Sequence, residues 1–149
     1  MLRALVASAG AGILYTHLGK VVDPLVPFGT GTVEAFRRLA RLRDEGTILV
    51  TTTRRLLRYL TVRDHLRWRA EVVGDRTVIT VDAVLDAVTG TRAPSPSDLE
   101  GMTFGVARGG PVDVRLADGQ AVGCETVPAA DGKTWVGIPW PPLRFPDLR

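Results

Sequence analysis

The hydrophobic periodicity of the chain changes near Val72, and this change limits the folds open to its 149 residues. Before Val72, apolar residues recur every three or four positions in two long segments, which is typical of helices that bury one face. After Val72, short segments alternate between apolar and polar residues and are separated by glycine and proline, which is typical of strands. We therefore expect an α/β domain over residues 1–70, followed by an all-β, sandwich-like domain over residues 71–149.

Two short apolar segments of the first half are expected to be buried strands. Ile13–Tyr15 follows a run of small residues, and Gly19 and two prolines come after it. Thr47–Thr51 is apolar throughout its centre, as in parallel strands that are covered on both faces.

Helices are expected after both strands, which gives the order β-α-β-α. The first begins at Thr32, whose side chain can cap it, and ends at Gly46, which tolerates a left-handed conformation. The second runs from about Arg54 to Ala70. Two parallel strands cannot close a barrel, because each edge leaves backbone groups unpaired. This half therefore lacks part of the sheet that it needs.

The second half carries several turn signals. Gly74, Asp118-Gly119 and Asp131-Gly132 each stand between short alternating segments, as in β-hairpins. The tail, Pro139–Pro146, is rich in proline and is expected to run as an extended strap. The strands that we expect are Val72–Val73, Thr77–Val81, Met102–Val106, Val112–Leu116, Ala121–Thr126 and Trp135–Ile138.

His17 is the candidate catalytic residue. It follows the first expected strand, and the carboxyl ends of parallel strands are where ligands bind in sheets covered by helices. An imidazole at such a rim can accept or donate a proton near neutral pH. Tyr15 and Thr16 lie beside it and are the candidate substrate-binding residues. The alternative is a histidine that only packs or caps.

Metal and disulfide chemistry are not expected within this chain. Cys124 is the only cysteine, so the chain forms no internal disulfide and no cysteine-based zinc site. The acidic residues nearest to His17, Asp23 and Glu34, match no metal-ligand spacing. We therefore assign neither metal ligands nor a cofactor to these residues.

The charge pattern does not favour nucleic acid as the partner. The formal net charge is only +3, and acidic residues lie among the arginines of the second helix. His65 lies at the charged end of that helix and is expected on a solvated face. If nucleic acid did bind there, Trp68 would stack on a base while the arginines met phosphates. These arginines are Arg54, Arg55, Arg58, Arg63, Arg67 and Arg69.

Two further observations concern aromatic residues and membranes. Trp135 and Trp140 are either core residues or a platform on which a sugar ring stacks. No stretch approaches the ~20 apolar residues that span a bilayer, and residues 1–15 make a poor secretion signal. We therefore expect a soluble protein without a membrane span, and its compartment stays open.

The first 60 residues resemble the final stretch of polysaccharide deacetylase-like barrels. The resemblance rests on Ile13–Gly19, on the helix from Ala35 to Gly46, and on Ile48–Leu57. In that family a late strand ends in a histidine that acts as the acid of the reaction, and a last strand with a terminal threonine precedes the closing helix.

The resemblance implies the end of a distorted (β/α) barrel with an appended β-sandwich that begins at Val72. It also implies a carbohydrate substrate and a divalent metal in the complete protein, with His17 protonating the departing amine. The family's Asp-Asp and His-x-x-x-His motifs, which supply the base and the metal ligands, do not occur in this sequence. A chain of this kind is expected to need the remainder of the barrel and to be inactive alone.

Two functional hypotheses follow. The first is a C-terminal portion of a polysaccharide deacetylase-like hydrolase that acts on carbohydrate N-acetyl groups. The second is a non-catalytic module in which the β-sandwich binds glycan or protein and His17 is inert.

Overall fold

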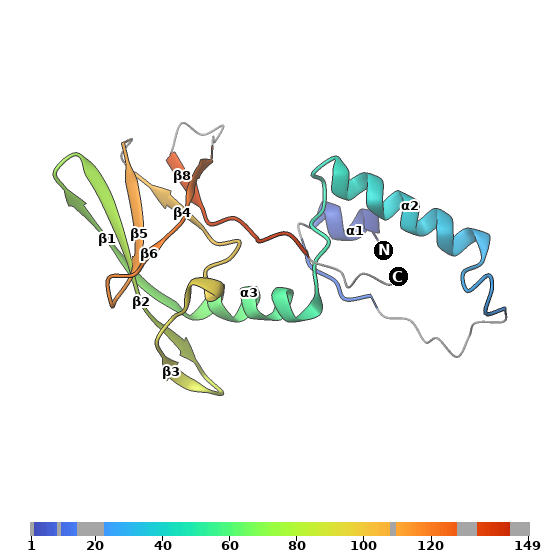
Figure 1. Ribbon diagram of the computed structural model, residues 1–149, viewed down its shortest axis with the longest axis horizontal. Coiled ribbons are helices and arrows are strands. Elements are labelled where there is room, and N and C mark those ends of the chain that lie inside the picture. Colours follow the sequence, from blue (N-terminus) through green and yellow to red (C-terminus); the bar gives the residue numbers. More distant parts are fainter. Residues whose placement is uncertain (1, 9, 15–22, 108–109, 128–133, 144–149) are drawn as a thin grey trace. The chain divides into compact units, whose positions relative to one another are not determined.

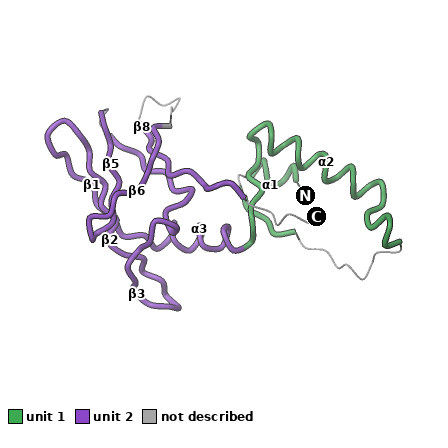
Figure 2. The backbone as a smooth tube through the Cα atoms, viewed as in Figure 1, with its two compact units in different colours: residues 1–53 green, residues 54–149 purple. Residues whose placement is uncertain are grey.

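The computed structural model describes residues 2–8, 10–14, 23–107, 110–127 and 134–143. The chain divides into two compact units, Met1–Thr53 and Arg54–Arg149 (Figure 2). Figure 1 shows the elements in chain order. They are α1 (Leu2–Ala7), α2 (Thr30–Asp44), α3 (Thr53–His65), β1 (Leu66–Val73), β2 (Arg76–Asp86), β3 (Gly90–Arg92), the 3-10 helix η2 (Pro96–Asp98), β4 (Thr103–Val106), β5 (Val112–Leu116), β6 (Ala121–Val122), β7 (Glu125–Val127) and β8 (Thr134–Gly137). The expected combination of helices and β-sheets is confirmed.

The first unit is helical in its described part. The expected helix is present as α2, although it begins at Thr30 rather than at Thr32, because the carbonyl of Gly29 accepts hydrogen bonds from the Thr32 and Val33 amides at 2.9 and 3.2 Å. It ends at Asp44, and Gly46, which follows the C-cap residue Glu45, has a φ of 71° in the left-handed region, as expected for the residue that stops the helix.

The expected strands of this unit are absent from its described residues. Residues 10–14 and 47–52 have no strand pairing, and Tyr15 lies outside the described residues. A strand needs a neighbour to take its backbone hydrogen bonds, and two isolated strands are marginal in water. The β-α-β-α order was therefore wrong for the part that the structure describes.

The first unit also has no hydrophobic core of its own among its described residues. None of them is buried. Ile13, Leu14 and Leu49 expose 51%, 58% and 63% of their surface. Phe36 of α2 is 49% exposed, and its ring contacts that of Phe28 with centroids 5.4 Å apart. Large apolar side chains among the described residues of this unit are thus exposed.

The second helix is shorter than expected. It ends at His65, and the segment from Leu66 continues as β1, which pairs antiparallel with β2 from Leu66↔Val84 to Val73↔Arg76. Residues 66–70 are therefore strand and not helix, because pairing with β2 outweighs their helical pattern. The division between units falls after Thr53, whereas the sequence placed a boundary after Ala70, inside β1.

The second unit contains two sheets. The larger has the order β1-β2-β5-β6, with β3 paired to β2, and the smaller has the order β4-β8-β7. The expected hairpin turns at Gly74 and Gly119 are present, with φ of 65° and 89°, whereas Asp131-Gly132 lies outside the described residues. Pairing is antiparallel except between β2 and β5, which run parallel. The purely antiparallel expectation was wrong there, because a long connection from β2 returns the chain to β5 in the same direction.

One hydrophobic core joins both sheets to α3. Val62 of α3 is fully buried in it, which explains why this helix belongs with the strands. Its buried members are Val62, Ile79, Val81, Val84, Leu99, Met102, Phe104, Val106, Val114, Leu116, Val122, Val136 and Ile138.

The remaining expectations concern the tail, Cys124 and membranes. Residues 139–143 carry no strand, and the Pro141 carbonyl accepts a hydrogen bond from Arg55 Nη1 at 2.8 Å. Cys124 is half-buried, and burial raises the pKa of its thiol. Among the described helices, none has the length and apolar character that crossing a bilayer requires.

Candidate functional site

The residues assigned to chemistry from the sequence lie outside the described residues. These are His17, Tyr15 and Thr16. Ile13 and Leu14, which were expected to deliver them to a sheet rim, are exposed and form no strand. The assignment of His17 stays a prediction.

The described part of the chain holds no group of three or more histidine, cysteine, aspartate or glutamate side chains able to bind a metal ion. Asp23, one of the acidic residues near His17 in sequence, instead accepts a hydrogen bond from the Leu25 amide at 2.8 Å in a local turn. The residues described here therefore do not fit the divalent metal that the deacetylase resemblance implies.

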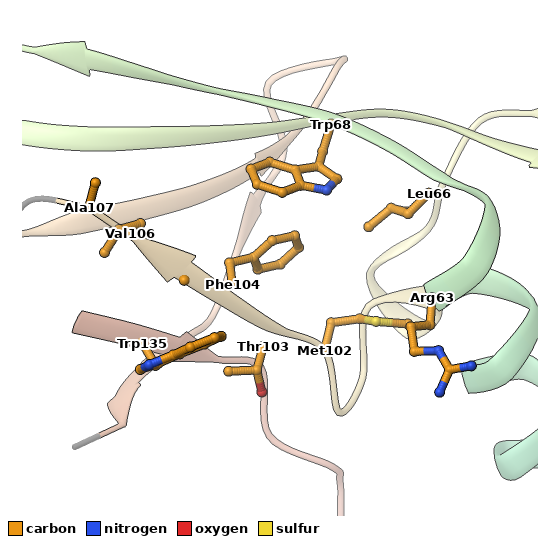
Figure 3. A pocket seen from close by; sticks show the side chains of 10 residues that line it. Arg63, Leu66, Trp68, Met102, Thr103, Phe104, Val106, Ala107 and Trp135 are labelled. Carbon is orange, nitrogen blue, oxygen red and sulfur yellow. The ribbon is translucent and has the colours of Figure 1, made fainter. Parts of the chain in front are cut away.

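The second unit contains an open groove of about 500 Å³ between β1 and β4 (Figure 3). Its lining is mostly apolar and comes from α3, β1, β4 and β8. The lining residues are Arg63, Leu66, Trp68, Met102, Thr103, Phe104, Gly105, Val106, Ala107 and Trp135.

The side chain of Trp68 extends from β1 toward β4. Its ring makes a T-shaped contact with Phe104, with centroids 5.2 Å apart and planes at 72°. The pairing of β1 with β2 shifts register between Arg67 and Trp68, and such irregularities re-aim side chains. Phe104 is buried, whereas Trp68 exposes 43% of its surface, so Trp68 offers an accessible aromatic ring.

Trp135 lines the same groove from β8. It pairs with Gly105 of β4, and its ring covers that glycine, since an added Cβ there would lie 3.2 Å from Trp135 Cη2 and Cζ3. A side chain at this position would fit only if the ring moved by a few tenths of an ångström. Figure 3 shows Trp135 on the opposite side of Phe104 from Trp68.

A charged group stands at one end of the groove. Arg63 at the end of α3 donates to Asp64 Oδ1 from Nε at 2.8 Å, and its guanidinium carbon lies 6.0 Å from the centre of the Tyr59 ring. The hydrogen bond to Asp64 raises the pKa of Arg63, and the same bond lowers the pKa of Asp64. The groove thus combines aromatic surface with a permanent cation.

Trp140 does not share this groove. Its ring lies 5.9 Å from that of Tyr59 and 5.8 Å from the Arg55 guanidinium carbon, and it fills the space beside Gly101. Trp140 is therefore not among the residues that line this groove, and Trp135 and Trp140 share no surface there.

The arginine series on and after α3 is largely engaged within the chain. Arg55 and Arg58 donate to the carbonyls of Pro141 and Ser97, Arg63 donates to Asp64, and Arg69 donates to Glu71 and Asp82. Guanidinium groups with internal acceptors are poorly placed to meet a row of phosphates. His65 lines a second, smaller hollow of about 350 Å³ beside Leu66 and Trp68.

Comparisons with models of protein families, with curated protein sequences and with solved structures gave no significant match. The resemblance to polysaccharide deacetylase-like barrels therefore rests on the residues of the sequence.

Sequence reasoning missed the groove for an identifiable reason. Trp68 was placed on a helix, far from any strand tryptophan. The alternation in Arg67-Trp68-Arg69-Ala70-Glu71, which puts charged residues on one face, was the available signal for a strand.

Proposed function

We propose that this chain is the C-terminal portion of a polysaccharide deacetylase-like hydrolase, which removes N-acetyl groups from a carbohydrate. The observation that carries the proposal is the lack of buried residues in the described part of Met1–Thr53. Helices stay folded chiefly because they bury an apolar face against another layer. Phe36 and Leu49 are exposed in this chain. In the proposed complete protein, the remaining strands and helices of a (β/α) barrel would pack against them and bury them.

The segments expected as strands support the same proposal. Residues 10–14 and 47–52 are unpaired in this chain. In a closed barrel each such segment has a strand on either side, which satisfies its backbone groups. An incomplete barrel end would lose these partners when it is separated from the rest.

In this proposal His17 donates a proton to the departing amine nitrogen as the carbon–nitrogen bond of the acetamide breaks, and water supplies the oxygen of the acetate. Tyr15 and Thr16 contact the substrate beside it. Because the described residues hold no metal site, no metal-dependent step is assigned to this chain.

The second candidate is a non-catalytic glycan- or protein-binding module. It is favoured by the aromatic groove of the second unit, which has its own core. In that case His17 takes no part in chemistry.

The test is acetate release from N-acetylglucosamine oligomers by the native protein that contains this chain, isolated with an antibody against residues 54–149. We expect a protein larger than 16.1 kDa that releases acetate. His17→Ala should lower the rate by roughly 100-fold or more, as the loss of a general acid does. The control variant His65→Ala should keep the rate. A native protein of 16.1 kDa, or a rate unaffected by His17→Ala, would contradict the proposal.

A further inference from the structure

We propose that the chain pairs with a second copy of itself along the outer edge of β1, as an antiparallel dimer whose two-fold axis passes at Ala70. The larger sheet has the order β1-β2-β5-β6, so β1 is an end strand and pairs only with β2 among the residues that the structure describes. Figure 1 shows β1 on the side of β2 away from β5. The edge of an end strand presents backbone groups to which another strand can add.

Two features that protect edge strands are missing from β1. The strand is eight residues long, and it contains no proline. Its residues after Leu66 are all exposed. The register shifts between Arg67 and Trp68, near one end, but the pairing with β2 is regular from Trp68 to Val73. This regular part of β1 is therefore a straight edge that a second strand can join.

The backbone groups of alternate residues in β1 point away from β2. Val73 and Arg76 flank a two-residue turn and pair with each other, and residues in this position exchange hydrogen bonds. Hydrogen-bonded and non-hydrogen-bonded positions alternate along an antiparallel pair. The N–H and C=O groups of Trp68, Ala70 and Val72 are thus directed outward, where a second strand would meet them.

The charges of β1 select one register for such a pair. With the two-fold axis at Ala70, Arg69 of each chain lies opposite the partner's Glu71, so two pairs of opposite charge form. An axis at Arg69 would oppose two arginines, and an axis at Glu71 would oppose two glutamates. Opposite charges on facing strands stabilise a sheet, whereas like charges destabilise it.

Arg69 and Glu71 are already held on one face of the strand. Arg69 Nε donates to Glu71 Oε1 of its own chain at 3.1 Å, and Arg69 Nη1 donates to Asp82. The two side chains still expose 52% and 55% of their surface, and a guanidinium has five N–H donors. They can therefore also bind the partner's charges, and they lose less side-chain entropy because they are fixed beforehand.

The same register brings apolar side chains together on the other face. Trp68 lies opposite the partner's Val72, and the two side chains are 43% and 57% exposed in the single chain. An aromatic residue facing a β-branched one is a favourable cross-strand pair. The contact with Phe104, at 5.2 Å between centroids, holds the Trp68 ring on this face and leaves the edge of the strand open. Both faces of β1 are thus complementary to a second copy, which favours this occupant over a strand of another protein.

Sedimentation of the 149-residue chain measures the dimer. We expect a dimer at roughly 0.1 mM, since an interface of this size is weak. Glu71→Arg should raise the dissociation constant roughly tenfold or more, because both pairs of opposite charge become pairs of like charge. Glu125→Arg is the matched control. It makes the same change at an exposed position of β7, the end strand of the smaller sheet, and should leave the constant within about twofold.

A mixture of two variants tests the register. Arg69→Glu should also prevent self-association, because its two glutamates would face the same two glutamates in the partner. Mixed with Glu71→Arg, it should form a one-to-one dimer, in which the glutamates of one chain face the arginines of the other. Circular dichroism of each variant checks that it is folded, since Arg69→Glu loses the bond to Asp82.

Hydrogen exchange of the wild-type chain needs no variant. The outward amides of Ala70 and Val72 should exchange roughly tenfold more slowly at dimer-forming concentration than in dilute solution. Three results would overturn the proposal: a monomer at roughly 0.1 mM, which would leave the edge to another protein; a dimer that Glu71→Arg does not weaken; or a mixture of the two folded variants that stays monomeric.

Discussion

Arg92 and Asp98 form a bidentate ion pair beside the core of the second unit. Arg92 Nη1 and Nη2 donate to the two carboxylate oxygens of Asp98 at 2.7 and 2.8 Å, and Asp98 is buried. The amide and hydroxyl of Ser95 also donate to Asp98 Oδ2, at 2.9 and 2.7 Å. This cluster ties β3 to the 3-10 helix that leads into β4.

The stability of the chain should fall in acid because of this pair. Burial tends to raise the pKa of Asp98, but the hydrogen bonds from Arg92 and Ser95 outweigh it and lower the pKa from 3.8 to about 2. The unfolded state therefore takes up the proton first as the pH falls. The contribution of roughly 2 kcal/mol is complete above pH 4 and is lost between about pH 4 and pH 2.

Urea unfolding of the wild-type chain and of Asp98→Asn across this range measures that contribution. Asp98→Asn should be less stable at pH 7, and its unfolding free energy should vary less below pH 4. Parallel pH profiles for the two proteins would show that Asp98 is not the group responsible.

Two glycines separate the effect of backbone strain from the effect of crowding. Gly101 and Gly119 have φ of 80° and 89°, so a side chain strains the backbone at both. At Gly101 the added Cβ would also lie 2.2 Å from the Trp140 ring, whereas Gly119 has open space. We expect Gly119→Ala to cost about 1 kcal/mol and Gly101→Ala to cost about 1–3 kcal/mol more. Equal losses in chemical denaturation would mean that Trp140 does not pack against Gly101.

The assignment of α3 to the second unit can be tested on the helix itself. Val62 is fully buried in the core, and Leu57 on the same helix exposes 51% of its surface. Val62→Ala should cost roughly 2 kcal/mol through the cavity that it leaves. Leu57→Ala should change the unfolding free energy by less than about 0.5 kcal/mol. The reverse order in thermal or chemical unfolding would contradict the packing of α3 on this core.

Local sequence patterns correctly predicted those helices and strands that are determined by their own residues. The strand Val112–Leu116 matches β5, and the stop at Gly46 follows from a left-handed residue after a helix. The end of α3 was missed because Leu66 and the residues after it are drawn into a strand by β2, which lies further along the chain.

The groove required tertiary information for the same reason. Trp68 and Phe104 are far apart in sequence, and only the placement of β1 and β4 around one core brings their rings into contact. Thr47–Thr51 shows the opposite case, because its strand pattern finds no partner among the described residues. Such a pattern predicts a strand only where the rest of the sheet is present.

Amide hydrogen exchange of the 149-residue chain tests most directly the proposal that the first unit, whose described residues include none that is buried, is completed by further polypeptide. Exchange is slow where opening an amide requires unfolding of a packed core. We predict that the amides of α2 exchange orders of magnitude faster than those of β2 and β5, whose Ile79 and Val114 are buried. If the α2 amides were protected as long as those of β2, the first unit would be a stable domain by itself, and the claim would be wrong.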